Sequence, residues 1–207
     1  MKLKLPLFFS AFLLAVFFAA SCSDSSANQP SADTIKTDTV SPKENSVRGV
    51  TYTGFVSMTS VDSLHDSLLP SMWKLWVAES WNPLDTLVTL NKINGGYPPA
   101  YGFVNVDTIT LPAEKMLDRY GSLYGNFLAD AGASFGGRSL PESSKNRIYY
   151  KFKVLKPIPQ VLAGKAIPWF GQPGMGEQYM VPNKINDLIT AGYLTITDSV
   201  PAKPAKK

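Results

Sequence analysis

Alternation of hydrophobic and polar side chains is clearest between Ile148 and Leu155. One face of this run carries Ile148, Tyr150, Phe152 and Val154, and the other carries Tyr149, Lys151 and Lys153. A period of two is typical of a strand with one buried face. Shorter extended runs at residues 50–56, 108–111 and 193–196 predict three more strands.

Helical spacing of hydrophobic residues occurs in two other stretches. Between residues 60 and 90, leucines, a methionine and tryptophans recur at mixed helical spacing, and Pro70 and Pro83 divide them into one or two short helices. Residues 183–190 form the second pattern, with Asn183 as the predicted N-cap and Gly192 as the stop. Together the patterns predict an α+β fold: a single compact domain of short twisted antiparallel strands with a few peripheral helices.

The first residues are organised as a secretory signal peptide. Lys2 and Lys4 precede an apolar run over residues 5–20, and small residues lead to Cys22. The run is short for a membrane span, which needs about 20 apolar residues. Residues 19–22, Ala-Ala-Ser-Cys, resemble the lipobox of bacterial lipoproteins, which implies cleavage before Cys22 and acylation of that cysteine. An ordinary cleaved signal with an incidental cysteine is the alternative.

Composition divides the chain into five segments. They are a signal peptide (1–21), acylated Cys22 with a disordered linker (22–48), an N-terminal strand and helix portion that packs on the core (49–94), the main domain (95–198) and a basic disordered tail (199–207). The linker contains almost nothing apolar, so it cannot offset the entropy lost on ordering. Cys22 is the only cysteine, so packing must hold the fold without a disulfide.

Net charge gives little indication of a nucleic-acid partner. The formal net charge is +4, and loss of Lys2 and Lys4 with the signal lowers it to +2. Part of the remaining positive charge comes from the lysines of the C-terminal tail. We therefore expect no nucleic-acid partner.

A sharp, stiff loop is predicted at residues 170–179, with the sequence Phe-Gly-Gln-Pro-Gly-Met-Gly-Glu-Gln-Tyr. Glycine permits positive φ and close approach of the backbone, and proline fixes its own φ. Gln178 is the side chain that such a loop would position. Its neighbour Glu177 points to the opposite side of an extended chain, so we expect it at the surface.

Several motifs follow one another in the second half of the chain. They are Tyr-Pro-Pro at 97–99, Gly-Phe at 102–103, Asp-Arg-Tyr-Gly at 118–121, Gly125, Arg-Ser-Leu-Pro at 138–141, Lys-Pro-Ile-Pro at 156–159, Gly164, the glycine-rich loop with Gln178, Leu-Ile at 188–189 and Gly-Tyr-Leu at 192–194. Together they resemble the TNT domain, named for the tuberculosis necrotizing toxin, a family of NAD+ glycohydrolases. The resemblance runs from about Tyr97 to Ile196.

The resemblance implies a set of site residues. Arg119 and Arg138 match arginines that line the NAD+ site in the family, and Gln178 and Phe127 match a glutamine and an aromatic on which members rely. Some toxic members require a histidine near the position of Tyr150, where this chain has none. The only histidine, His65, lies among polar residues, and we expect it to be solvated. The resemblance implies no metal and no cofactor, with NAD+ as the substrate.

Elementary chemistry agrees with these residue types. Nicotinamide leaves as a neutral molecule, so its departure does not need the general acid of ordinary glycosidases. The planar guanidinium groups of Arg119 and Arg138 suit pyrophosphate oxygens. An ion pair within the fold, for instance between Arg119 and Asp118, is the alternative. Gln178 can hold a ribose hydroxyl or the attacking water, although it could instead satisfy loop backbone.

Three aromatic residues are further candidates for substrate contact. Phe127 and Tyr120 can stack on nicotinamide or adenine, with an added attraction to the cationic pyridinium. Tyr150 can present its hydroxyl to the pocket, although its strand face favours packing. A core position is the alternative for all three.

The resemblance therefore implies an enzyme that hydrolyses the nicotinamide–ribose bond of NAD+ to nicotinamide and ADP-ribose. With the lipobox, it predicts an exported toxin or effector, lipid-anchored in the bacterial cell envelope at the outer membrane or cell surface. A producing cell would need a cognate immunity protein. The alternative is a catalytically weak or inactive TNT-like surface lipoprotein that binds a nucleotide or a protein partner.

Overall fold

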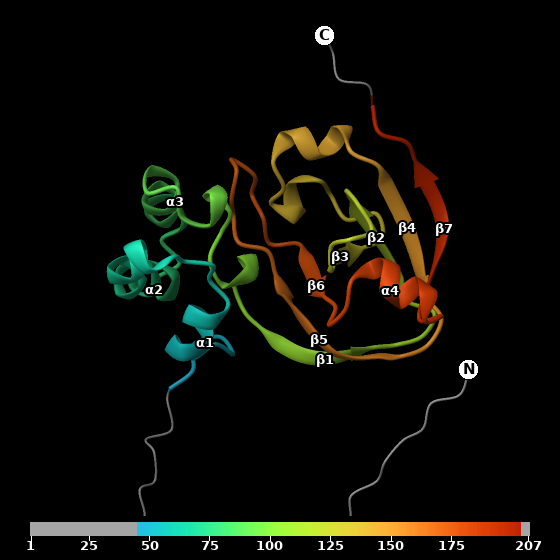
Figure 1. Cartoon of the computed structure of the whole chain (residues 1–207), viewed down its shortest axis with the longest axis horizontal. Helices are drawn as coiled ribbons and strands as arrows, with labels where there is room; N and C mark the ends of the chain where they lie inside the picture. Colours follow the sequence, from blue (N-terminus) through green and yellow to red (C-terminus); the bar gives the residue numbers. More distant parts are fainter. Residues whose placement is uncertain (1–44, 204–207) are drawn as a thin grey trace, which may run out of the picture. The chain divides into compact units, whose positions relative to one another are not determined.

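A computed structural model of the chain describes residues 45–203. The predicted signal peptide, Cys22 and most of the predicted linker lie outside the described residues, as does the end of the tail. The described chain consists of a group of short helices followed by one antiparallel sheet (Figure 1). The predicted fold class is confirmed. Within these residues no helix is long and apolar enough to cross a membrane.

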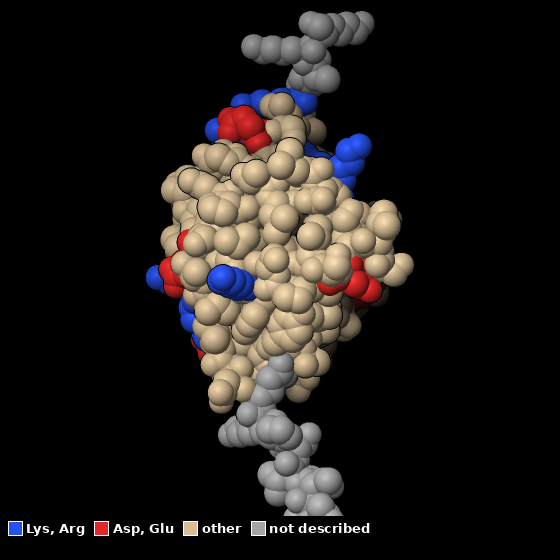
Figure 2. Space-filling view, turned by 90° about the vertical axis from the view of Figure 1, so that its left-hand side faces the viewer, with Lys and Arg blue, Asp and Glu red and all other residues tan. Residues whose placement is uncertain are grey.

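Four short helical elements form the N-terminal part: α1 (Tyr52–Ser57), the 3₁₀ helix η1 (Ser63–Leu68), α2 (Leu69–Val77) and α3 (Trp81–Leu90). Pro70 lies in the first turn of α2 and Pro83 in that of α3, where a missing N–H costs no intrahelical hydrogen bond. Each proline thus lies near the start of a helix and does not interrupt one. The prediction of short helical pieces is confirmed. The outer face of this part carries few charged side chains (Figure 2).

The strand predicted at residues 50–56 is wrong, because α1 occupies most of it. The Thr51 hydroxyl accepts a hydrogen bond from the Gly54 N–H at 3.0 Å and caps the helix. Helical backbone then brings Phe55, which is fully buried, against the rings of Trp73 and Trp76. Burial of this aromatic group outweighs the local preference of β-branched residues for strands.

The fold begins earlier than the predicted linker boundary. Val47 pairs with Val50 in an isolated bridge. Arg48 donates to the carbonyl oxygens of Trp76, Val77 and Val104, at 2.7, 3.2 and 2.8 Å. The described end of the linker is therefore part of the packed structure.

Two 3₁₀ turns, η2 (Ile93–Gly96) and η3 (Ala100–Gly102), lead from the helices to the sheet. The strands are β1 (Asp107–Leu111), β2 (Met116–Tyr120), β3 (Phe127–Asp130), β4 (Tyr149–Val154), β5 (Ile158–Lys165), β6 (Glu177–Met180) and β7 (Leu194–Val200). Their order is β1-β5-β6-β3-β2-β4-β7, and every pairing is antiparallel. Two further 3₁₀ turns, η4 (Gly136–Arg138) and η5 (Glu142–Asn146), lie between β3 and β4. Sheet order therefore places β6, which carries Gln178, beside β3, which begins at Phe127.

The predicted strands at residues 108–111, 148–155 and 193–196 are confirmed as β1, β4 and β7. The longest strand, β5, was not predicted, because Pro159 and Gly164 are typical breakers. The pairing of β1 with β5 shifts register between Ile109 and Leu111, close to the proline. A proline is tolerated next to such an irregularity because no regular ladder bond is required there.

Two hydrophobic clusters stabilise the described chain. One lies between the sheet and α4 (Ile185–Thr190), and the other joins the N-terminal helices to Ile167 and Trp169 of the later chain. Lys184, rather than the predicted Asn183, is the N-cap of α4 and makes no side-chain capping bond. Gly192 adopts φ 71° just after the helix, as expected for a C-terminal stop.

A buried ion pair ties β2 to the segment between β3 and β4. The Asp118 carboxylate is fully buried and pairs with both terminal nitrogens of Arg138. It also accepts from the Gly132 N–H at 2.8 Å and from the Tyr149 hydroxyl at 2.6 Å. Arg138 in turn donates to the Ala133 carbonyl. A charge taken out of water needs this number of partners to be tolerated.

We expect Asp118→Asn to lower the free energy of unfolding by about 3–5 kcal/mol, because it leaves the Arg138 guanidinium buried without its counter-charge. Urea unfolding followed by circular dichroism measures the change. Asp198→Asn is the matched control, since Asp198 pairs with Lys151 at the surface and its loss should leave stability essentially unchanged. Equal stability of the two variants would contradict a stabilising role for Asp118.

Candidate active site

Two cavities meet where the helical part, β2, β3 and β6 approach one another. They share the side chains of Arg119, Tyr120, Phe127, Arg138, Leu140 and Gln178. The larger measures about 380 Å³ and the smaller, which reaches Asp118, about 60 Å³. The larger volume falls within the range of about 300–1,000 Å³ that small-molecule sites occupy. The structure thus brings both predicted arginines and the predicted glutamine to one cleft.

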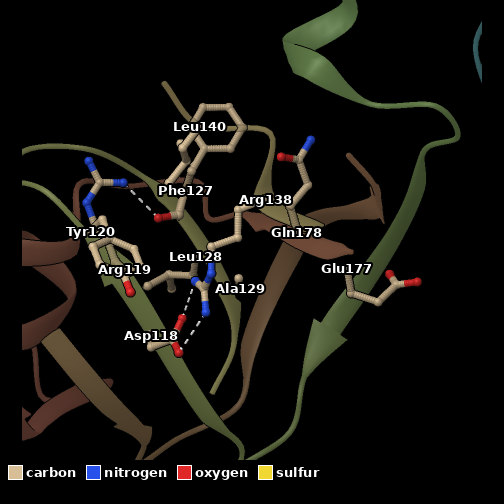
Figure 3. A pocket seen from close by; sticks show the side chains of 10 residues that line it. All are labelled: Asp118, Arg119, Tyr120, Phe127, Leu128, Ala129, Arg138, Leu140, Glu177 and Gln178. Atoms are coloured by element: carbon tan, nitrogen blue, oxygen red, sulfur yellow. Dashed lines mark hydrogen bonds and ion pairs between the residues drawn. The ribbon is translucent and has the colours of Figure 1, made fainter. Parts of the chain in front are cut away.

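The Gln178 carboxamide is held in a defined orientation by backbone carbonyls. Its Nε2 donates to the Gly102 oxygen at 3.0 Å and to the Tyr101 oxygen at 3.4 Å. With both N–H groups directed at carbonyls, the amide oxygen is left as an acceptor. Figure 3 shows this oxygen on the side of Phe127, while Glu177 points away from the other side chains. The opposite directions of Glu177 and Gln178 follow from strand alternation.

The glycine-rich loop before β6 is bound tightly to η4. The N–H of Gly174 donates to the Gly136 oxygen at 3.0 Å, and that of Gly176 donates to the Gly137 oxygen at 2.9 Å. A Cβ on Gly176 would lie 2.7 Å from the Gly137 oxygen, so only glycine permits this approach. The loop therefore delivers the chain to β6 along a fixed path, immediately before Gln178.

The carbonyls that hold Gln178 lie on a strained segment. Ala100 and Tyr101 adopt φ values of 52° and 51°, which are costly for residues with a side chain. The helical part fixes them there, because the Ala100 N–H donates to the Thr59 hydroxyl and the Tyr101 N–H to the Met58 oxygen, both at 3.0 Å. The N-terminal part thus takes a direct share in building the site.

Arg119 lines both cavities and has no carboxylate partner among the described residues. Its Nε donates to the Ser122 oxygen and its Nη1 to the Phe127 oxygen, both at 2.8 Å. The remaining N–H groups are available to a ligand. Burial, together with the nearby charge of Arg147, lowers the pKa of Arg119. The alternative of an Arg119–Asp118 ion pair is not observed.

The position of Arg119 depends on Gly125. A Cβ on Gly125 would lie only 2.1 Å from Arg119 Nη2. The φ of Gly125 is not positive, so the missing side chain serves space and not backbone conformation. The Arg119 guanidinium therefore occupies the space that a side chain at residue 125 would fill.

Arg138 lines both cavities, but most of its donors serve the fold. Two of its nitrogens pair with Asp118, and Nε and Nη2 donate to the Ala133 oxygen. Of the five N–H groups of a guanidinium, one is left. The alternative weighed for this arginine, an ion pair within the fold, is what the structure contains.

Of the three predicted aromatic contacts, two line the cleft. Phe127 and Tyr120 line both cavities, whereas Tyr150 lines neither and packs against the sheet core beside Phe152. The predicted role of Tyr150 in the pocket is not supported, because alternation along β4 turns its side chain to the hydrophobic face.

Its neighbour Tyr149 faces the other way and was missed by the sequence reasoning. The Tyr149 ring lies 4.7 Å from that of Tyr120, and its hydroxyl donates to Asp118. Burial, and then the bond to Asp118, raise the pKa of Tyr149, so it stays a donor at neutral pH. The alternation at residues 148–155 already placed Tyr149 on the non-core face, which was the available signal.

Three residues that line the larger cavity were also missed. Tyr97 and Tyr101 line the larger cavity from the helical side, and Arg147 lines it from the segment after η5. No local sequence pattern indicates that these residues line the cavity, because their position there depends on the packing of segments that are distant in the sequence.

Among residues 45–203, no cluster of three or more histidine, cysteine or acidic side chains could hold a metal ion. His65 is half-buried, and its Nδ1 lies 2.5 Å from Asp62 Oδ1. It is therefore less solvated than expected.

Comparison with known proteins gives a family match and a sequence relative. Residues 110–196 match the model of the family described as tuberculosis necrotizing toxin. A relative, the conidial surface nicotinamide adenine dinucleotide glycohydrolase of Aspergillus fumigatus, is 42% identical over 117 residues, which are 49% of this chain and 49% of that protein. This chain thus spans about half the length of that relative.

Two solved structures are also similar in part. The tuberculosis necrotizing toxin, complexed with its immunity factor, is 26% identical over 48% of this chain and 60% of its own, with a TM-score of 0.43. Rhs1-CT, in complex with its cognate immunity protein, is 18% identical over 48% of this chain and 83% of its own, with a TM-score of 0.35. The similarity rests on the family model and the sequence relative: residues 110–196 match the tuberculosis necrotizing toxin family.

Proposed function

We propose that this protein hydrolyses NAD+ to nicotinamide and ADP-ribose. One observation carries the proposal: the oriented carboxamide of Gln178 and the unpaired guanidinium of Arg119 line one cleft together with Phe127. The family of residues 110–196 and the name of the fungal relative support the same chemistry.

The reaction breaks the bond between ribose C1′ and the nicotinamide nitrogen. The bonding electrons leave with nicotinamide, which departs neutral, and the ribose becomes oxocarbenium-like. A water oxygen then bonds to C1′, and its proton is lost to solvent. Of the two carboxylates at the smaller cavity, Asp118 is committed to Arg138 and Glu177 points away. A route that needs no side-chain acid suits this arrangement.

Gln178 supplies a hydrogen-bond acceptor for the ribose or for the attacking water. Its amide oxygen is a free acceptor, whereas its nitrogen is fixed by two carbonyls. An acceptor held in advance can bind a ribose hydroxyl or the attacking water and stabilise positive charge as it develops, with no reorganisation. Phe127 offers an aromatic face for the nicotinamide ring.

The absence of a histidine from the lining of both cavities keeps a second candidate function open. A catalytically weak or inactive module of the same family would bind a nucleotide in this cleft without turnover. Nicotinamide release by the purified protein distinguishes the two, because only the enzyme produces it above the level of the Gln178→Ala variant.

Location and partners complete the proposal. The lipobox-like residues before Cys22 support a lipid anchor in a bacterial envelope, and the fungal relative is named as a surface protein. A surface enzyme that consumes NAD+ acts as a toxin only after delivery into another cytoplasm. A producing cell would then need a cognate inhibitor protein.

We expect Gln178→Ala to lower kcat for NAD+ by about 100-fold or more, because one preorganised polar group at the reacting carbon is lost. Nicotinamide release measures the rate, and the melting temperature reports the fold. The control is Gln172→Ala, which changes a half-buried glutamine on the same glycine-rich loop that bonds to Glu142 and lines neither cavity. Equal rates in the two variants would remove Gln178 from the mechanism.

Arg119→Ala should raise KM for NAD+ about tenfold while leaving the protein folded, because charge-assisted contacts to an anionic substrate are lost. Initial rates over a range of NAD+ concentrations give KM and kcat. If the variant instead unfolds, the two carbonyl contacts of Arg119 are its main purpose.

Gly125→Ala should raise KM in the same way, since the added methyl displaces the Arg119 guanidinium. A double-mutant cycle tests the cause: in the Arg119→Ala background, Gly125→Ala should have no further effect on KM. Additive effects would show that Gly125 acts independently of Arg119.

A further inference from the structure

Two of the four arginines at residues 45–203 lack a carboxylate partner. Arg48 pairs with Glu79 and Arg138 with Asp118. Arg119 bonds only to carbonyl oxygens, and the side chain of Arg147 has neither an ion pair nor a hydrogen bond within the described chain. Arg147 is exposed and lines the larger cavity. Both arginines without a carboxylate partner thus lie at the cleft.

The side chains of the two unpaired arginines both lie beside Gly121. The position of a Cβ on Gly121 lies 3.7 Å from Arg119 Nη2 and 3.9 Å from Arg147 Cδ. The charge of Arg147 contributes to the lowered pKa of Arg119, which is the expected effect of like charges at short range. Such an arrangement costs free energy until an anion lies between the two groups.

The larger cavity offers no internal anion. Among the described residues that line the larger cavity there is no aspartate or glutamate, whereas Arg119, Arg138 and Arg147 all contribute. Arg138 brings its own counter-ion with it and has one N–H to spare. Net positive charge in the cleft therefore comes from Arg119 and Arg147.

We propose that Arg119 and Arg147 together bind the diphosphate of the substrate, and that Arg138 acts as a positioning residue that holds Asp118 and the cavity wall. The proposal rests on the proposed function and changes its division of labour, because Arg147 takes the anion-binding place that the sequence assigned to Arg138. Two planar guanidinium groups, on side chains that both lie beside Gly121, can each contact a different phosphate.

Calorimetric titration of the purified full chain with inorganic pyrophosphate tests the anion site without catalysis. Arg147→Ala should weaken pyrophosphate binding about tenfold and reduce its dependence on salt concentration. Lys145→Ala is the matched control, because this substitution also removes one positive charge, two residues away. Lys145 pairs with Glu142 and lines neither cavity. Equal binding by the two variants would overturn the proposal.

Steady-state kinetics with two substrates distinguish diphosphate binding from a purely structural role of Arg147. Arg147→Ala should raise KM for NAD+ about tenfold with little change in kcat, and should leave cleavage of nicotinamide riboside, which has no phosphate, unchanged. An equal loss with both substrates would contradict diphosphate binding. If the wild-type protein releases no nicotinamide but binds pyrophosphate through Arg147, the hydrolase function fails and the anion site stands.

Discussion

The carboxylate of Asp118 is fully buried, and four donors from three parts of the chain converge on it. Arg138 is the last residue of η4, to which the glycine-rich loop is bonded, and Tyr149 is the first residue of β4. Because a buried charge tolerates no missing partner, this network fixes the wall of the cleft. The surfaces that face a ligand are built around it.

Gln178 is likewise positioned by residues far from it in the sequence. Its carboxamide is oriented by the carbonyls of Tyr101 and Gly102, which lie in a left-handed segment bonded to Met58 and Thr59. The family match begins only at residue 110, yet the geometry of the glutamine depends on the helical part before it. The strained backbone at Ala100 and Tyr101 thus lies in the segment that orients the Gln178 carboxamide.

The arginines divide into supporting and ligand-facing groups. Arg48 and Arg138 have their charges compensated and join parts of the fold, whereas Arg119 and Arg147 keep free donors beside a cavity with no acidic lining. In the proposed NAD+ hydrolysis, Arg119 and Arg147 would face the diphosphate, and the neutral amide oxygen of Gln178 would face the sugar. The positive charge that develops on the ribose in the proposed reaction would then lie next to this oxygen and not next to an arginine.

The sequence by itself determined the α+β class, the alternating strand β4, the division of residues 60–90 into short helices, and the glycine-rich loop before Gln178, because these rest on local periodicity and turn chemistry. Sequence reasoning misjudged α1 and β5, where the burial of Phe55 and an irregular register at Pro159 overrode local preference. Tertiary structure alone decided which guanidinium has a counter-ion and which faces the cleft. Those outcomes depend on contacts between residues far apart in the chain, such as Asp118 with Arg138, which no local pattern encodes.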